Sequence, residues 1–181
     1  MYTIKLTDLN LPLTPFEFVR LFLPSVRKFC VENDFDVANT LAHMALESGW
    51  NRQSMHFNFF GMKWNKKVSA FYYTSVTTEY LTPKQLTKEF VERFNPSRTG
   101  KNINGKEEYI IRDKFCAFAD IEDGLNGYKA MLELSFPKSY EARNTYAFFL
   151  HLKSEGYATA PDYVHILEGL RDYFNSSIHA I

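Results

Sequence analysis

The chain lacks most of the features that mark a specialised class of protein. Its 181 residues include only two cysteines, Cys30 and Cys116, too few for a disulfide framework, and we expect both to be free, buried thiols. Lys and Arg number 21, as do Asp and Glu, so the formal charge is zero and no basic field favours nucleic acid or an anionic membrane. No apolar run is long enough to span a membrane, and residues 1–8 do not form an export signal. We predict a soluble chain without a leader of its own.

Aromatic residues, by contrast, are abundant: 17 Phe, 11 Tyr and 2 Trp make up 17% of the chain. Most of these rings are expected in the core, although aromatic faces also line sites for sugars and bases. A hydrophobic content of 45% in 181 residues supports one compact core. The sequence has no internal repeat or low-complexity segment, so we predict one domain over residues 1–181.

The residues around Glu47 are the most informative part of the chain. At about 100° per residue, one apolar helix stripe faces the core and leaves Glu47 on the opposite side. The stripe consists of Ala38, Leu41, Ala42, Ala45 and Leu46. Gly49 is typical of the left-handed residue that ends a helix, which puts Glu47 in the last turn, where the helix dipole disfavours a second negative charge. If Trp50 and the aromatics after it also exclude water, Glu47 suits general acid catalysis at neutral pH; the simpler interpretation is a solvated surface carboxylate.

Capping residues and composition divide the rest of the chain into segments. Residues 14–17 carry a capping box that opens a helix, Pro24 should break this helix in two, and Asp36 can cap the helix that carries Glu47. Further along, we expect strands over about 70–81 and 108–118, a helix over 83–93, a loop over 95–105, and helices that begin at Asp120, about Tyr140 and Pro161. The predicted fold is α+β and mainly α, with a β lobe at about 70–118 that contains an inserted helix and loop at about 82–105.

Four segments of the chain resemble, in order, the signature blocks of a known family. They are Ala-Leu-Glu-Ser-Gly-Trp at 45–50, Asn-Phe-Phe-Gly-Met-Lys at 58–63, Thr-Thr-Glu-Tyr at 77–80 and Gly-Tyr-Ala-Thr-Ala-Pro-Asp-Tyr at 156–163. The blocks are similar to those of bacterial peptidoglycan β-N-acetylglucosaminidases, the glucosaminidases of autolysins, flagellar rod-cap hydrolases and phage lysins. The resemblance implies a lysozyme-like helical lobe, a small antiparallel β lobe flanking a glycan groove, and cleavage of the β-1,4 bond between N-acetylglucosamine and N-acetylmuramic acid.

The resemblance also implies roles for individual residues. Glu47 would be the general acid, Glu79 the second carboxylate that positions or activates water, and Tyr157 a residue beside the acid. Substrate contacts are expected from Trp50, Asn58, Phe59, Gly61, Lys63, Trp64, Phe118 and Tyr163. Glycoside hydrolysis needs one protonated carboxyl and a second group that manages water or the oxocarbenium-like charge, which fits this pair, and either an inverting or a substrate-assisted route stays open. No cofactor is expected, and His43 with Glu47 forms an i, i+4 pair without a third metal ligand.

Two departures from the family pattern keep other interpretations open. Position 160 is Ala where the family usually has Asp, and residues 115–118 read Phe-Cys-Ala-Phe where it often has Phe-Arg-Ala-Tyr. The alternatives are a muramidase or lytic transglycosylase, and a non-catalytic glycan-binding or virion structural module. In the main interpretation the partner is the peptidoglycan glycan strand, and the protein works as a monomer on the bacterial cell wall, outside the cell or in the periplasm. It would reach the wall as a phage endolysin, on a virion, or through a separate export system.

Overall fold

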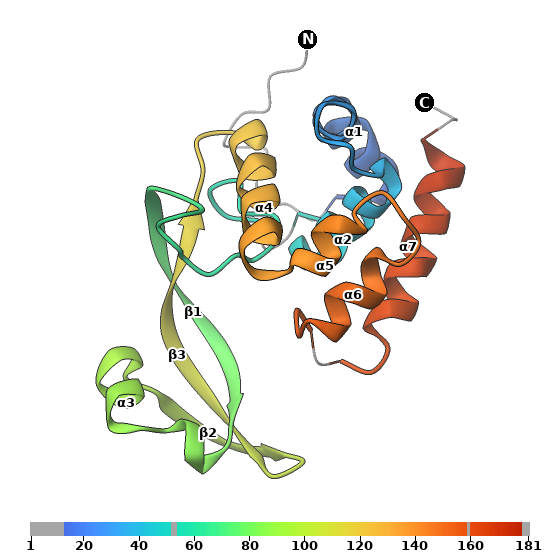
Figure 1. The fold of residues 1–181 in the computed structure, drawn as a ribbon. Helices are drawn as coiled ribbons and strands as arrows, with labels where there is room; N and C mark the ends of the chain where they lie inside the picture. The colour runs from blue at the N-terminus through green and yellow to red at the C-terminus, as the bar shows by residue number, and fades with distance from the viewer. Residues whose placement is uncertain (1–12, 52–53, 159, 179–181) are drawn as a thin grey trace. The chain divides into compact units, whose positions relative to one another are not determined.

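A computed structural model of the chain describes residues 13–51, 54–158 and 160–178. Within these ranges the fold combines helices with one small sheet, and the predicted α+β, mainly α class is confirmed (Figure 1). The chain divides into two compact units: unit 1 comprises Met1–Phe71 and Cys116–Ile181, and unit 2 comprises Tyr72–Phe115. None of the helices in the described part of the chain is long and apolar enough to cross a membrane.

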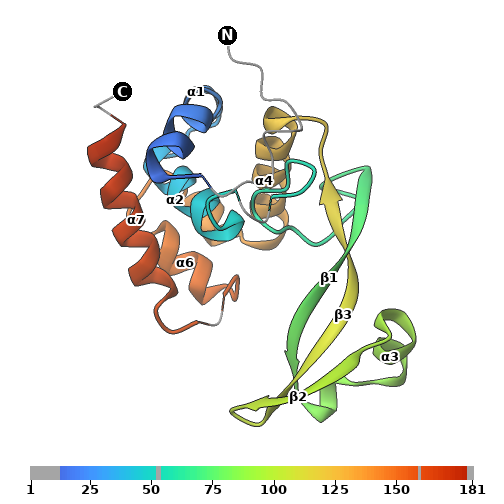
Figure 2. The same ribbon diagram turned by 180° about the vertical axis from the view of Figure 1, so that it is seen from behind.

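Unit 1 is built from helices around one central helix. The central helix is α2 (Val37–Ser48), which packs against α1 (Pro15–Asn33) and α7 (Tyr163–Ser177). The remaining helices of this unit are α4 (Ile121–Ser135), α5 (Pro137–Glu141) and α6 (Phe148–Ser154). Seen from both sides, α2 lies between α4 and α7 (Figures 1 and 2). The core of unit 1 therefore surrounds the helix that carries Glu47.

Helix α1 shows one expected and one unexpected feature. The capping box is confirmed, because the Thr14 side chain accepts a hydrogen bond from the Glu17 main chain and the Glu17 carboxylate accepts one from Thr14 N at 2.8 Å. The predicted break at Pro24 is wrong, because α1 is continuous. Pro24 and Arg20 both lie on the exposed side of the helix. Proline has no amide hydrogen to donate to the carbonyl of Arg20, four positions earlier. Burial of the opposite side holds the helix together across the proline.

Helix α2 has the predicted ends but not the predicted exposure. Asp36 caps it by accepting a hydrogen bond from Asn39 N at 2.7 Å, and Gly49 ends it in the left-handed conformation with φ 55°. The helix is buried on almost every side, polar residues included, because other helices pack around it. The side chain of Glu47 is accordingly only 24% exposed rather than a solvated surface group.

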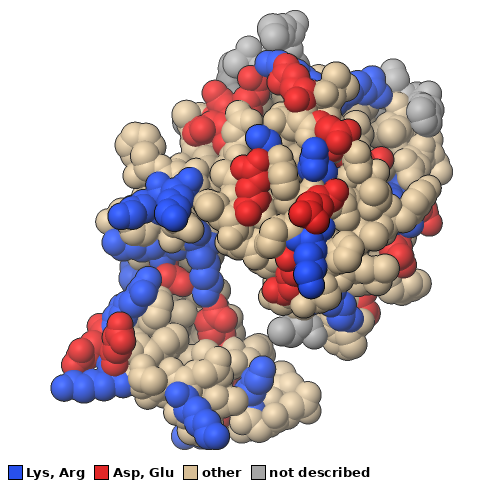
Figure 3. Space-filling model, in the orientation of Figure 1, with Lys and Arg blue, Asp and Glu red and all other residues tan. Residues whose placement is uncertain are grey.

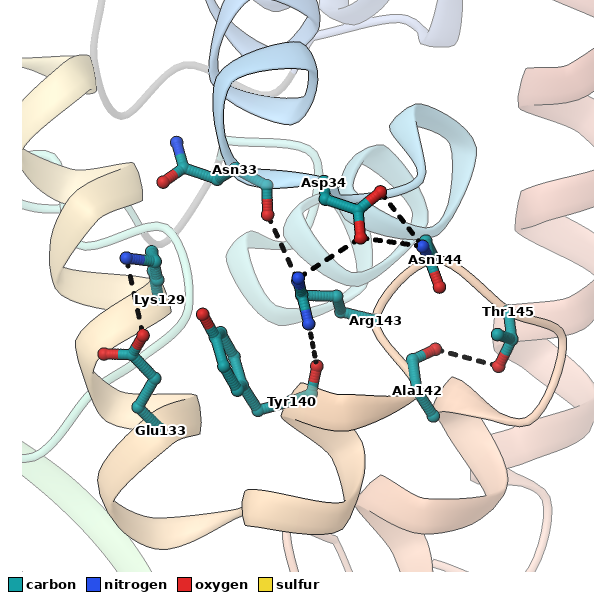
Figure 4. A network of polar contacts seen from close by, with 9 residues as sticks. All are labelled: Asn33, Asp34, Lys129, Glu133, Tyr140, Ala142, Arg143, Asn144 and Thr145. Carbon is teal, nitrogen blue, oxygen red and sulfur yellow. Dashed lines mark hydrogen bonds and ion pairs between the residues drawn. The ribbon is translucent and has the colours of Figure 1, made fainter.

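The second half of unit 1 differs from the sequence prediction at one place. Asp120 caps α4 as expected, but the single helix predicted from about Tyr140 to Lys153 is wrong, because α5 and α6 are separated by a turn. Figure 4 shows what holds this turn: the Arg143 guanidinium donates to the carbonyl oxygens of Asn33 and Tyr140 at 3.1 and 3.0 Å. Arg143 Nη2 and Asn144 Nδ2 also donate to the Asp34 carboxylate at 3.2 and 3.0 Å. The chain is not helical at 142–147, the segment from which Arg143 and Asn144 make these bonds.

Unit 2 contains a three-stranded sheet with the order β1-β3-β2. Its strands are β1 (Phe71–Leu81), β2 (Ser97–Ile103) and β3 (Lys106–Ala117), and β2 pairs antiparallel with β3. The loop predicted at 95–105 is wrong, because Asn104 and Gly105 take φ values of 53° and 77° and form the tight turn of a β2–β3 hairpin. Figure 3 shows Lys and Arg side chains gathered over the strands, with acidic side chains between them.

A small helical insertion covers one end of this sheet. The helix predicted over 83–93 is replaced by a 3₁₀ turn, η2 (Pro83–Gln85), and a short helix, α3 (Lys88–Phe94). Thr82 forms the predicted capping box with Gln85, and Thr87 caps α3, so two start signals divide the segment. The insertion packs on a separate hydrophobic cluster of the sheet, formed by Leu81, Tyr109 and Ile111 with Leu86, Phe90 and Phe94.

Candidate active site

A cavity of about 400 Å³ lies in unit 1 beside the C-terminal end of α2. Its volume falls in the range of about 300–1,000 Å³ that is typical of small-molecule sites. The walls come from the end of α2, the segment 60–68, the end of α4 and the turn after α6. The residues that line it are Glu47, Phe60, Gly61, Met62, Lys63, Asn65, Val68, Met131, Ser135, Phe136 and Tyr157. Glu47 is the one acidic side chain among these lining residues.

The carboxylate of Glu47 is held from behind by α7. Tyr163, the first residue of α7, is buried and donates a hydrogen bond from its hydroxyl to Glu47 Oε1 at 3.1 Å. Burial raises the pKa of the Tyr163 hydroxyl, and the negative charge of Glu47 raises it further, so the phenol keeps its proton. Among the described residues no hydrogen bond to Oε2 is formed. One oxygen of the carboxyl group is thus fixed by the protein, while the side chain lines the cavity.

Behind this pair lies His43, one helical turn before Glu47 and fully buried. Its Nε2 is 2.9 Å from the Tyr163 hydroxyl and its Nδ1 is 2.7 Å from the hydroxyl of Tyr128 on α4. Burial raises the pKa of Tyr128 well above its usual value, so this hydroxyl also stays protonated. Both ring nitrogens are occupied by hydroxyl groups, which leaves no lone pair for a metal. Within the described ranges, no cluster of three or more His, Cys, Asp or Glu residues could hold a metal ion.

Tyr157 reaches the cavity from the turn that follows α6. Gly156, with φ 85°, ends the helix and lets Tyr157 N donate to Leu152 O at 3.0 Å, which directs the chain back toward the cavity. The Tyr157 hydroxyl donates to the Phe60 carbonyl at 3.0 Å, and its ring lies 4.6 Å from the His43 ring. Burial raises its pKa, as does the nearby charge of Glu47. Tyr157 therefore joins the wall segment 60–68 to the side of the site that carries Glu47.

The block at 58–63 separates into a buried anchor and an exposed rim. Asn58 is buried: its amide nitrogen donates to Met62 O and Cys116 O at 2.9 and 3.1 Å, and its amide oxygen accepts from Met62 N at 2.9 Å. Phe59 is also buried, with its ring 5.0 Å from that of Phe22. Gly61, with φ 60°, and Lys63 are exposed and line the cavity. The anchor shapes the loop, and the rim faces the space.

Three other predicted contact residues lie away from the cavity lining. Trp50 is half-buried against α1 and α7, 5.3 Å from the ring of Phe18 and 5.8 Å from that of Phe174. Trp64 donates from Nε1 to Ser69 O at 3.2 Å and packs on the core. Phe118 is buried against Gly127, where a Cβ atom would clash with its ring.

Glu79 belongs to unit 2, on β1. It lies on the same face of the strand as Tyr73, Ser75 and Thr77, and all four are half-buried, whereas the alternating residues from Tyr72 to Tyr80 are exposed. The stacked rings of Tyr73 and Phe115, 5.7 Å apart, hold one end of this face. The structure thus brings Glu47, Tyr157, Gly61 and Lys63 to one cavity, with Tyr163 behind Glu47, and places Glu79 on a separate unit.

Some residues of the site carry no sequence signal that points to it. Phe60 is buried and stacks on Tyr128 at 3.7 Å, and it also lines the cavity. The end of α4 contributes Met131, Ser135 and Phe136 to the cavity. The sequence signal there is Pro137, which indicates that a helix ends just before it. The sequence marks His43 only by its i, i+4 spacing from Glu47, whereas the structure shows that its ring nitrogens contact tyrosine hydroxyls.

The site thus presents a carboxyl group that is fixed at one oxygen and lines a cavity of about 400 Å³. Residues 23–176 match the model of the Glucosaminidase family, described as mannosyl-glycoprotein endo-β-N-acetylglucosaminidase, and the chain belongs to this family. A comparison with curated proteins gives no match.

Solved structures with the same fold include proteins from Listeria, Salmonella and Sphingomonas. The catalytic domain of the autolysin Auto from Listeria monocytogenes is 20% identical with a TM-score of 0.61, over 90% of this chain and 86% of that one. The glycoside hydrolase domain of FlgJ from Salmonella typhimurium is 18% identical with a TM-score of 0.60, over 93% and 92%. A peptidoglycan hydrolase from Sphingomonas sp. A1 is 20% identical with a TM-score of 0.57, over 91% and 94%. These similarities confirm the predicted lysozyme-like fold.

Proposed function

We propose that the chain is a peptidoglycan hydrolase, an endo-β-N-acetylglucosaminidase that cleaves the β-1,4 bond between N-acetylglucosamine and N-acetylmuramic acid. Membership of the glucosaminidase family supports a glycan substrate, and the presence of the same fold in an autolysin and a peptidoglycan hydrolase favours the bacterial cell wall. The observation that carries the proposal is the position of Glu47, an acidic side chain of the cavity wall whose Oε1 is held by Tyr163.

In this proposal Glu47 is the general acid. Its carboxyl proton passes to the glycosidic oxygen as the bond to the sugar breaks, and the carboxylate that remains accepts the hydrogen bond of the Tyr163 hydroxyl. Because hydrogen bonds to charged groups are stronger than those between neutral groups, this bond gains strength as the proton leaves. Glu79 is proposed as the second carboxylate, which positions or activates water at the sugar carbon.

The glycan strand is proposed to bind along the exposed rim of the cavity. Gly61 offers main-chain groups without a side chain, Lys63 offers a positive charge to the carboxylates of the wall polymer, and Phe136 and Tyr157 offer aromatic surface. Asn58, Phe59 and Phe118 are buried, so their proposed part is to support the loop and not to touch the sugar. Trp50 and Trp64 would act in the same way through packing.

The place of action follows from the substrate. A hydrolase of the wall polymer works outside the cytoplasm, and we propose that this one acts as a monomer at the wall or in the periplasm. Release as a phage endolysin, carriage on a virion and export by a separate system are the routes that fit such a protein.

The products of digestion test the proposal. Purified peptidoglycan is incubated with the protein, and the sugar at each new reducing end is identified by mass spectrometry after borohydride reduction. Reducing N-acetylglucosamine is the expected product. Reducing N-acetylmuramic acid would assign a muramidase, its anhydro form a lytic transglycosylase, and the absence of soluble fragments together with retained binding a non-catalytic module; each of these results contradicts the proposal.

A further inference from the structure

Three helices meet at the buried side of Glu47 in a continuous line of hydrogen bonds. The line runs from the Tyr128 hydroxyl to His43 Nδ1, from His43 Nε2 to the Tyr163 hydroxyl, and from that hydroxyl to Glu47 Oε1, with distances of 2.7, 2.9 and 3.1 Å. Tyr128 comes from α4, His43 and Glu47 from α2, and Tyr163 from α7. All of them belong to unit 1.

The surroundings of His43 are dry and aromatic. Its side chain is fully buried, and the rings of Tyr157, Phe60 and Phe148 lie 4.6, 5.6 and 6.1 Å from it. The charged group that faces it is the Glu47 carboxylate, 3.6 Å from Nε2 on the same helix. Among the described residues, the other titratable groups around it are the hydroxyls of Tyr128, Tyr157 and Tyr163, and burial raises the pKa of each. These surroundings restrict which group donates and which accepts in each hydrogen bond of the line.

The proton count decides these directions. A tyrosine hydroxyl has one proton to donate, and an ionised carboxylate only accepts, so the Tyr163 proton points at Glu47 Oε1. The Tyr163 oxygen is then left to accept from His43, which requires a proton on Nε2. If Nδ1 also carried a proton, the Tyr128 hydroxyl would be buried without an acceptor, which is unfavourable. Nε2 of His43 therefore carries a proton and Nδ1 accepts a hydrogen bond from the Tyr128 hydroxyl, an assignment made from the network of hydrogen bonds.

We propose that His43 is a positioning residue for the glycosidase reaction, acting through Tyr163. By donating to the Tyr163 oxygen, it makes this hydroxyl donate to Oε1 in both states of Glu47. When Glu47 is protonated, Oε1 already accepts a hydrogen bond, so the acidic proton resides on Oε2. The proton that Glu47 gives to the glycosidic oxygen therefore resides on Oε2, the carboxyl oxygen that is not held by Tyr163. This inference rests on the proposed function of Glu47 as the general acid.

The proposal predicts a pattern among four variants. His43→Gln keeps one acceptor for Tyr128 and one donor for Tyr163, so kcat should stay within about threefold of the wild-type value. His43→Leu has the bulk but neither group, and kcat should fall by about tenfold to a hundredfold with KM nearly unchanged, since a hydrogen bond to a charged group contributes about 1.5–3 kcal/mol. Tyr163→Phe should show a similar loss, and His43→Leu combined with Tyr163→Phe should be no worse than Tyr163→Phe alone.

The experiment measures kcat and KM on soluble glycan strands released from peptidoglycan, with wild type and Glu47→Gln in parallel. Wild type that forms no reducing N-acetylglucosamine, or Glu47→Gln as active as wild type, overturns the proposed function and this inference with it. If those two behave as expected, a His43→Leu variant with wild-type kcat overturns the role of His43 alone. The role of His43 is also overturned if the kcat of His43→Gln is as low as that of His43→Leu. It is overturned as well if the double variant has a kcat below that of Tyr163→Phe by the same factor that His43→Leu alone produces.

A spectroscopic measurement on the wild-type protein does not depend on activity or on the folding of variants. Long-range ¹H–¹⁵N spectra separate protonated from unprotonated ring nitrogens, and the His43 signals are assigned by their absence in His43→Gln. We expect the ring proton on Nε2 and an unprotonated Nδ1. A proton on Nδ1, alone or together with one on Nε2, contradicts the proposal.

Discussion

The hydroxyl group of Tyr163 lies 3.1 Å from Glu47 Oε1, although the two residues are 116 positions apart in the chain. The bond joins the first residue of α7 to the last turn of α2, and the two helices pack against each other. The acidic residue proposed for catalysis is therefore held in place only when the last helix is folded onto the centre of unit 1. This dependence ties the site to the tertiary structure and not to the local sequence around Glu47.

Glu79→Gln tests the second carboxylate. If Glu79 positions or activates water, the variant should lose about a hundredfold or more of kcat, while the thermal midpoint changes little because the amide has the same shape. Glu92→Gln, at an exposed position of α3 in the same unit, is the matched control and should keep full activity. An active Glu79→Gln enzyme would assign the water to another group.

Arg143→Ala tests the turn between α5 and α6. Arg143 donates to Asn33 O, Tyr140 O and Asp34 Oδ2, and its side chain is only 19% exposed, so the variant leaves three acceptors without this partner. We expect a loss of roughly 2–4 kcal/mol in the free energy of unfolding, measured by urea denaturation. Arg20→Ala, an exposed arginine on α1, should change it by about 0.5 kcal/mol or less. Equal effects of the two variants would show that the turn does not depend on Arg143.

The buried thiol of Cys30 makes stability depend on alkaline pH. Burial raises the pKa of Cys30 from 9.0 to about 12, so between these values the unfolded chain has lost a proton that the folded protein keeps. The folded state binds more protons there, and the free energy of unfolding therefore falls as the pH rises through this window. The buried tyrosines act in the same direction, so the test compares urea denaturation of wild type and Cys30→Ala at about pH 8 and about pH 10. A smaller decrease is expected in Cys30→Ala, and equal decreases would refute the assignment.

The elements that could be predicted from the sequence are those whose signals are local. The capping box at Thr14, the cap at Asp36 and the glycine stop at Gly49 are each set by residues within one turn, and all three are confirmed. The predictions that are wrong depend on distant partners or on a short turn signal within a longer segment. Pro24 is tolerated because the opposite face of α1 is buried, and Asn104–Gly105 is a hairpin signal within what was predicted as a loop.

The candidate site follows the same division. Glu47 can be predicted as a site residue because the end of its helix and the motif around it are adjacent in the sequence. The contact of its carboxylate with Tyr163, by contrast, depends on the packing of α7. Likewise, Asn58 and Phe59 belong to a recognisable block, but only the tertiary structure shows that their side chains are buried anchors. A motif indicates which segment forms a site; the surrounding helices decide which of its side chains face the cavity.

The kcat of Glu47→Gln on purified peptidoglycan is the most direct test of the account. The amide still accepts the hydrogen bond from Tyr163 but has no proton to give, so kcat should fall by about a hundredfold to ten-thousandfold while the free energy of unfolding stays within about 0.5 kcal/mol. Glu141→Gln, an exposed carboxylate of the same unit, serves as the control and should be fully active. A Glu47→Gln enzyme that releases reducing N-acetylglucosamine at the wild-type rate, or one that loses activity only because it unfolds, would contradict the assignment of Glu47 as the general acid.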